Sequence, residues 1–97
     1  DIKLPEHEFQ LLKDDYIKGL KNQYADMRKQ YKKMDIEGLS RNVHMLKGAA
    51  NMFECETLYI KALAVDSALK NDTVTLDTQL FASLFKAMED EIDKVCH

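Results

Sequence analysis

The sequence predicts an all-α protein, namely an antiparallel up-down four-helix bundle that forms a single domain over residues 1–97. Three observations lead to this fold class. Apolar residues repeat at steps of three and four along four separate segments, which is the period of an amphipathic helix. The chain contains only 3 glycines and 1 proline, so few positions interrupt a helix. The links between the four segments are short, which makes consecutive helices run antiparallel.

The first predicted helix starts at Pro5 and runs to Lys32 and Lys33. Proline is tolerated at the first helical position, and Glu6 and Glu8 follow where the helix dipole favours negative charge. The two lysines are favourable at the opposite end for the same reason. The apolar stripe of this helix consists of Phe9, Leu12, Tyr16, Leu20, Tyr24, Met27 and Tyr31.

The second predicted helix begins after Asp35, whose carboxylate can accept a hydrogen bond from an unpaired amide of the first turn. The helix is expected to end near Phe53 or Glu54. Its predicted buried stripe consists of Ile36, Leu39, Val43, Leu46, Ala50 and Phe53.

Two shorter helices complete the predicted bundle. Thr57 is the expected cap of the third helix, which residues 70–72 end, and Thr75 or Asp77 is expected to start the fourth. The third helix carries Leu58, Ala62, Val65 and Leu69, with Leu63 and Ala68 widening its apolar side. The inward residues of the fourth helix are Phe81, Leu84, Phe85, Met88, Ile92 and Val95.

Composition and cysteine spacing disfavour several classes of function. The net charge of -3 argues against a general nucleic-acid binder, which needs a basic surface. Cys55 and Cys96 have no C-x-x-C spacing, so we expect reduced thiols in the cytoplasm. No run of about 18 apolar residues predicts a membrane span. The first residue is Asp1 rather than Met, which suggests a domain of a longer polypeptide.

One face of the second helix carries residues that do not serve packing. At about 100° per residue, His44 points roughly 140° away from the centre of the buried stripe, so we expect its imidazole to face solvent. A free imidazole side chain has a pKa of about 6.5, so its neutral form can attack an electrophilic phosphorus. The residues within about 60° of its direction are Glu37, Ser40, Arg41, Lys47, Gly48 and Asn51.

Each of these residues also has an ordinary explanation. A single histidine on a bundle helix is more often a surface or partly packed residue than a reactive one. Lys47 taken alone would be a solvated charge, and Gly48 taken alone would be a close contact between helices. Glycine inside a helix costs about 1 kcal/mol relative to alanine, so Gly48 does not stabilise the helix by itself.

The order His-x-Leu-Lys-Gly on an exposed helix face resembles the histidine-containing phosphotransfer (HPt) domain of multistep two-component phosphorelays. The motif is formed by His44, Leu46, Lys47 and Gly48. The resemblance extends through the small and apolar positions that follow, namely Ala49, Ala50, Phe53 and Leu58, and through the Val65-Asp66 pair, where the family tends to carry Leu-Glu. By sequence it covers the second and third helices, and by architecture the whole chain.

The resemblance implies a specific role for each motif residue. His44 would accept a phosphoryl group from an aspartate of one receiver domain and pass it to a second receiver. Lys47 would stabilise the phosphoryl charge, and Gly48 would leave room for docking. Further docking residues would be Glu37, Ser40, Arg41, Met45, Asn51 and Met52, with the methionines as adaptable apolar contacts or, equally, scattered surface residues.

The same resemblance implies that the domain is no kinase and needs no cofactor of its own, because the magnesium ion would be held by the receiver. We expect a cytoplasmic monomer, from a hybrid sensor kinase for example. The family often has a glycine where this chain has Glu54, so the turn after the second helix is expected to differ.

Two other classes of function compete with this interpretation. One is a pure interaction module in which the histidine does no chemistry. The other is a metal or haem bundle, which the sequence disfavours because His7, His44 and His97 lie on different segments and no Glu-x-x-His pair is present.

Overall fold

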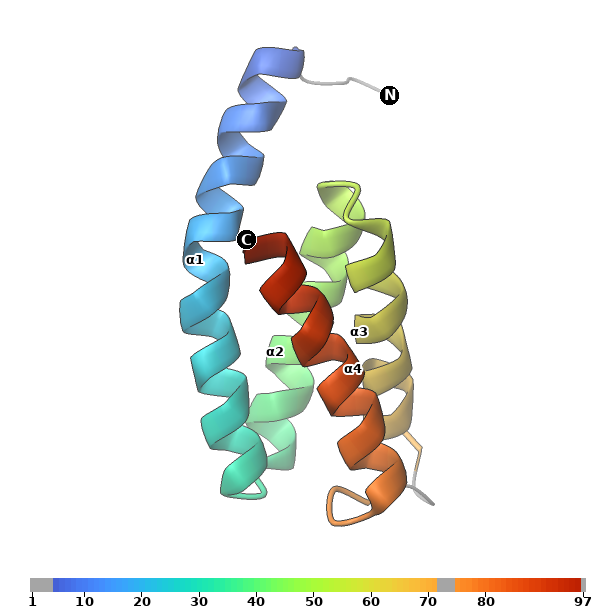
Figure 1. Ribbon diagram of the computed structural model, residues 1–97. Coiled ribbons are helices and arrows are strands. Elements are labelled where there is room, and N and C mark those ends of the chain that lie inside the picture. The colour runs from blue at the N-terminus through green and yellow to red at the C-terminus, as the bar shows by residue number, and fades with distance from the viewer. Residues whose placement is uncertain (1–4, 72–74, 97) are drawn as a thin grey trace.

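The computed structural model of the protein describes residues 5–71 and 75–96, and within these ranges it contains four helices and no strand (Figure 1). They are α1 (Glu6–Lys32), α2 (Ile36–Met52), α3 (Glu56–Leu69) and α4 (Gln79–Cys96). Consecutive helices run in opposite directions, so the predicted all-α four-helix bundle is confirmed. Asp72 and His97, which the sequence interpretation used, lie outside the described residues.

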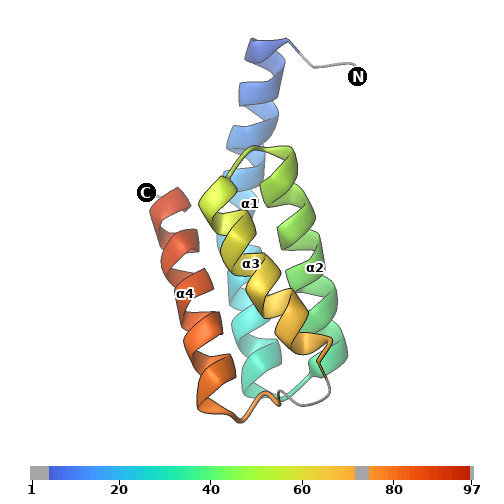
Figure 2. The ribbon, with the colours of Figure 1, turned by 90° about the vertical axis from the view of Figure 1, so that its right-hand side faces the viewer.

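The four helices form a square in cross-section. Helix α1 packs against α2 and α4, and α3 packs against the same two helices from the opposite side (Figure 2). The side of the bundle formed by α2 and α3 is therefore opposite the side formed by α1 and α4. Helix α1 has 27 residues, about 40 Å of helix, and its N-terminal turns project past the ends of its neighbours (Figure 1).

The core follows the predicted stripes closely. Leu20, Val43, Leu46, Phe81 and other predicted inward residues are buried, and among residues 5–71 and 75–96 the buried charged side chain is Asp66, at 1% exposure. Three predicted inward residues are exposed instead. Leu12 is 47% exposed although Phe9 and Tyr16 on either side of it pack against the Phe53 ring. Ile36, in the first turn of α2, is 53% exposed, and Leu63 on α3 is 37% exposed.

Helix starts were predicted with mixed success. Asp35 caps α2 as expected, since its side chain accepts a hydrogen bond from the Gly38 amide at 3.1 Å. Pro5 is the residue before α1 rather than its first helical residue. The prediction for Thr57 is wrong, because α3 already begins at Glu56.

The start of α4 also differs from the prediction. Helix α4 begins at Gln79, after both Thr75 and Asp77. The Thr78 hydroxyl accepts a hydrogen bond from the Phe81 amide at 3.2 Å, and the Thr78 carbonyl accepts one from Ala82 at 3.1 Å. Thr78 therefore has the hydrogen bonds of an N-cap, and a threonine three residues before the first buried phenylalanine was the signal for it.

The turns after α1 and α2 share one geometry. The backbone φ angle is 58° at Met34 and 59° at Glu54, the left-handed region that favours glycine. After α2, the amide of Glu54 donates to the Asn51 carbonyl at 3.2 Å and that of Cys55 to the Ala50 carbonyl at 2.8 Å. These two bonds define a Schellman turn. The turn at Glu54 thus keeps the backbone shape of a glycine turn without glycine.

Candidate functional site

Helix α2 presents His44 to solvent, as the helical projection predicted. The His44 side chain is 62% exposed, while Val43 and Leu46 on either side of it along the chain are fully buried. The buried apolar stripe of α2 fixes the rotation of the helix about its axis. His44 faces solvent because it lies on the side of the helix opposite that stripe. An exposed imidazole on a rigid helix is accessible to a second protein.

A shallow groove of about 520 Å³ lies beside the imidazole. We call it the His44 groove, and it is lined by Ile36, Glu37, Ser40, Arg41, His44, Met45 and Lys70. Ile36 and Met45 are each more than half exposed, so the groove combines apolar side chains with two cations. This composition suits contact with a protein surface that carries negative charge.

A buried carboxylate from α3 connects the groups around His44. Asp66 Oδ2 accepts hydrogen bonds from Lys47 Nζ at 2.8 Å and from Lys70 Nζ at 3.0 Å. The same oxygen lies 3.8 Å from Nδ1 of His44. The ammonium groups of Lys47 and Lys70 and the Nδ1 edge of the imidazole therefore all lie around the same carboxylate oxygen of Asp66.

The ionisation of Asp66 follows from two opposing causes. Burial raises the pKa of its carboxyl, since a charged group loses hydration in the protein. The hydrogen bonds and charges of Lys47 and Lys70 act in the other direction and outweigh burial, so the net pKa lies below the ordinary value. Asp66 is therefore an anion at neutral pH, and it faces the Nδ1 edge of His44.

Lys47 and Gly48 are placed in ways that the ordinary explanations do not cover. The Lys47 side chain is only 19% exposed and is paired with Asp66, so it is not a freely solvated charge. A β-carbon added to Gly48 would meet no atom within 4 Å, so the glycine is not required by a close contact between helices. What Gly48 provides is open space one helical turn from His44.

The remaining predicted site residues fall into two groups. Glu37, Ser40, Arg41 and Met45 lie with His44 in one groove. Asn51 lines a different depression near the end of α2, and Met52 is the last residue of that helix with 65% of its surface exposed. The structure therefore gathers only the first group around the imidazole.

Sequence reasoning missed Asp66 and Lys70 as parts of the site. The signal was present, because Asp66 directly follows Val65 and lies one turn after Ala62 within the apolar arc of α3. A carboxylate inside an apolar arc must find cations when it is buried. Lys70, four residues later, was the nearest such partner in the sequence.

The described residues contain neither a cluster of metal-binding side chains nor a membrane-spanning helix. No group of three or more histidine, cysteine, aspartate or glutamate side chains has the proximity of a metal site within residues 5–71 and 75–96. Among the same residues, no helix combines the length and apolar character of a membrane span.

Comparison with protein families gives one match. The family model described as "Hpt domain" matches residues 11–97, which is nearly the whole chain. No curated protein and no solved structure matches the chain significantly.

Proposed function

The chain belongs to the Hpt domain family and thus has a phosphotransfer role in a two-component system, and we propose that His44 is its phosphoacceptor. In this proposal His44 takes a phosphoryl group from an aspartyl phosphate of one receiver domain and passes it to an aspartate of another. The observation that carries the proposal is the exposed imidazole beside Asp66, Lys47 and Lys70.

The nucleophilic atom in this mechanism is Nε2. Asp66 faces Nδ1 at 3.8 Å and favours a proton on that nitrogen, which leaves the lone pair on Nε2. Nε2 attacks the phosphorus, and the bond from phosphorus to the aspartyl oxygen breaks with its electron pair remaining on the receiver carboxylate. The proton stays on Nδ1, so the ring becomes cationic and Asp66 stabilises it. Transfer to the second receiver is the reverse reaction.

The two lysines stabilise the charge of the transferred group. A phosphoryl group on histidine carries roughly two negative charges at neutral pH. Lys47 has three N–H donors and uses one of them on Asp66, so others are available to phosphoryl oxygens. Lys70, which is 59% exposed at the edge of the His44 groove, supplies a second ammonium group. Because Asp66 holds both lysines in advance, little reorganisation is needed during transfer.

Docking in this proposal uses the His44 groove. Ile36 and Met45 give an apolar contact, and Arg41 and Lys70 meet the acidic surface that surrounds a receiver aspartate. The magnesium ion that this chemistry requires is held by the receiver, and the domain acts as a monomer that binds no nucleotide.

The test is transfer of labelled phosphate from a panel of phosphorylated receiver domains to the protein and to His44→Gln. We expect an acid-labile label on the wild type and none on His44→Gln. His7→Gln is the matched control, since His7 is another exposed histidine, and it should be labelled like the wild type. Circular dichroism should show the same helical content in all three proteins, because neither side chain is part of the core.

Either of two results would contradict the proposal. Persistent label on His44→Gln would place the phosphoryl group on another residue. A wild type that binds receivers but takes no label from any of them would instead support a pure interaction module.

A further inference from the structure

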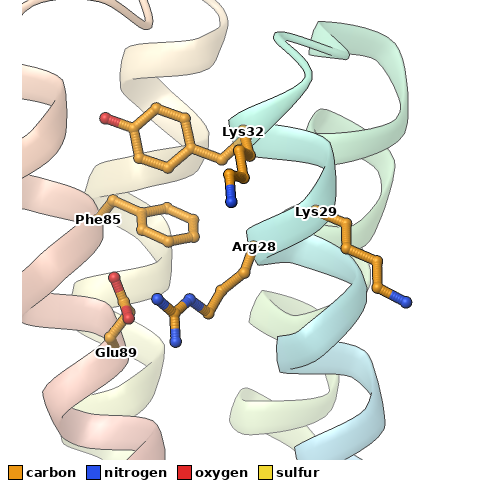
Figure 3. A pocket seen from close by; sticks show the side chains of 6 residues that line it. Arg28, Lys29, Lys32, Phe85 and Glu89 are labelled. Carbon is orange, nitrogen blue, oxygen red and sulfur yellow. The ribbon is translucent and has the colours of Figure 1, made fainter.

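A cleft between α1 and α4 has no part in the phosphotransfer mechanism. We call it the α1–α4 cleft. It has a volume of about 510 Å³ and is lined by Arg28, Lys29, Tyr31, Lys32, Phe85 and Glu89 (Figure 3). It is on the side of the bundle opposite the His44 groove and shares no lining residue with it, so a ligand in it would not cover His44.

The floor of the cleft is aromatic and held in place by packing. The ring centroids of Tyr31 and Phe85 are 4.7 Å apart, and the edge of Tyr31 meets Phe81 at 5.2 Å. Phe85 is almost fully buried, whereas Tyr31 is half-buried and offers part of its ring to the cleft. An apolar side chain placed there would contact rigid aromatic surface at little cost in conformational entropy.

The rim of the cleft is positively charged. Arg28 and Lys32 reach from α1 over the cleft, while Lys29 points away from it (Figure 3). In the described part of the chain these three cations form no ion pair, although Arg28 stacks over the Tyr24 ring at 5.7 Å. Other exposed cations, Lys18 and Lys21 among them, also form no ion pair within the described residues, but they do not line this cleft. Lys86 pairs with Asp90 and Lys94 with Glu91.

Two other features define how charge is distributed across the cleft. Glu89 lies on the α4 side, where its carboxylate accepts a hydrogen bond from the Tyr24 hydroxyl. The dipole of α1 favours cations in its last turn, which explains the positions of Lys29 and Lys32. It does not explain the position of Arg28, which lies before that turn and beside the aromatic floor of the cleft. The α1 side of the cleft therefore presents positive charge that forms no ion pair within the described residues, and Glu89 on the facing wall offsets only part of it.

We propose that the α1–α4 cleft binds an acidic peptide segment of a partner protein. Two carboxylates of the segment pair with Arg28 and Lys32, and an aromatic side chain between them rests on Tyr31 and Phe85. The guanidinium of Arg28 can bind one carboxylate through two parallel hydrogen bonds, which gives direction as well as attraction. An open cleft between two helices suits a segment of a partner protein, because recognition of linear segments commonly uses such surfaces.

The test is an NMR titration of the ¹⁵N-labelled protein with a synthetic peptide in which one phenylalanine lies between two pairs of glutamates. We expect saturable shifts at the amides of Arg28, Tyr31, Lys32 and Phe85, with no shift at His44. The double variant Arg28→Gln/Lys32→Gln should weaken binding by about tenfold, since two ion pairs are lost. Glu89→Gln should tighten it by about twofold, because a like charge is removed.

The matched control is Lys18→Gln/Lys21→Gln, which removes the same charge from exposed positions on the same helix and should leave the affinity unchanged. Equal weakening by both double variants would overturn the proposal, because attraction would then be unspecific. An equal affinity for the peptide with alanine in place of phenylalanine would also overturn it. Tighter binding of ATP or benzoate than of the peptide would assign the cleft to a small anion, and no saturable binding would leave it without this role.

Discussion

The two grooves on opposite sides of the bundle use positive charge in different ways. Between α2 and α3, Lys47 and Lys70 are held by one buried carboxylate, Asp66, before any partner arrives. In the α1–α4 cleft, Arg28 and Lys32 form no ion pair within the described residues, although Glu89 lines the opposite wall, and they lie beside aromatic rings. The first arrangement fixes the positions of its donors, and the second leaves them free to adjust.

This difference matches the two proposed roles. A phosphoryl group in transfer needs donors at fixed positions, because donors that must reorganise during the reaction stabilise the transition state less. A bound peptide needs only net attraction and an apolar contact, and its side chains can adjust to the cations. If both proposals hold, the buried carboxylate is the feature that distinguishes the groove for phosphotransfer from the cleft for peptide binding.

The largest expected difference between the grooves is the effect of removing a lysine on the rate of phosphoryl transfer. Lys47→Ala should slow transfer to the domain by about a hundredfold, because a charge-stabilising donor is lost, while leaving a measurable rate since His44 remains. Lys29→Ala removes the same charge at the rim of the opposite cleft and should leave the rate unchanged. The measurement is the initial rate of phosphoryl transfer from one labelled receiver. Equal rates for the two variants would remove the distinction between the grooves.

The next effect concerns stability and the carboxylate itself. Asp66→Asn should lower the free energy of unfolding by about 2 kcal/mol, because Lys47 and Lys70 lose a buried ionic partner while the side chain keeps its size. Asp90→Asn is the matched control, since Asp90 pairs with Lys86 on the exposed surface of α4, and its effect should be much smaller. Urea denaturation at pH 7 measures both. Similar losses for the two variants would mean that Asp66 has no special structural role.

The same pair of proteins predicts a dependence on pH. The pKa of Asp66 is lowered in the folded protein, so its carboxylate contributes stability that is complete above the unfolded value of about 3.9. That contribution is lost as the pH falls through the lower folded pKa. The stability gap between wild type and Asp66→Asn should therefore narrow progressively below about pH 4. A gap that widens on acidification would contradict the assigned direction of the shift.

Substitutions at Gly48 and Gly19 separate the effect of clearance beside His44 from the effect of helix propensity, and this effect is expected to be smaller. Both are exposed helical glycines, and a β-carbon at either would meet no atom within 4 Å. Leucine at either position should therefore stabilise its helix to a similar extent, by up to about 0.8 kcal/mol. Only Gly48→Leu should slow transfer, by about tenfold, because its side chain would fill the space beside His44. Unchanged transfer in Gly48→Leu would refute the idea that the glycine provides clearance.

Much of the fold was predictable because the helices bury continuous apolar stripes. The errors lie where that reasoning has least information, namely at helix ends and at the edge of the bundle. Leu12, Ile36 and Leu63 have the right period but are exposed, because the period alone does not show how far a neighbouring helix covers each turn. Thr57 is a good capping residue by type, yet α3 starts one residue before it, because capping preference alone does not decide between neighbouring positions.

The site was predictable only for residues on one helix. The helical projection located His44, Lys47 and Gly48 because all three share the geometry of α2. Asp66 and Lys70 come from α3, and no single-helix projection shows which residues of two helices meet. The buried state of Asp66 could be inferred from its place in the apolar arc, but its contact with Lys47 across the groove required the structure.

The turn at Glu54 gives the smallest expected effect. The turn at Met34 has the same type of hydrogen bonds, Met34 N–H to the Tyr31 carbonyl and Asp35 N–H to the Gln30 carbonyl, and is the comparison. Glu54 and Met34 both have φ near 60°, which costs a residue with a β-carbon about 1 kcal/mol or more. Glycine removes this cost but has a more flexible unfolded state, so Glu54→Gly should stabilise the protein by about 0.5–1 kcal/mol. Met34→Gly should gain slightly less, because Glu54 also places negative charge at a helix C-terminus. Glu54→Ala is the control, since it removes that charge and keeps the strained angle. Thermal denaturation measures these gains. Equal gains for Glu54→Ala and Glu54→Gly would show that the negative charge of Glu54, and not its backbone strain, is what destabilises this turn.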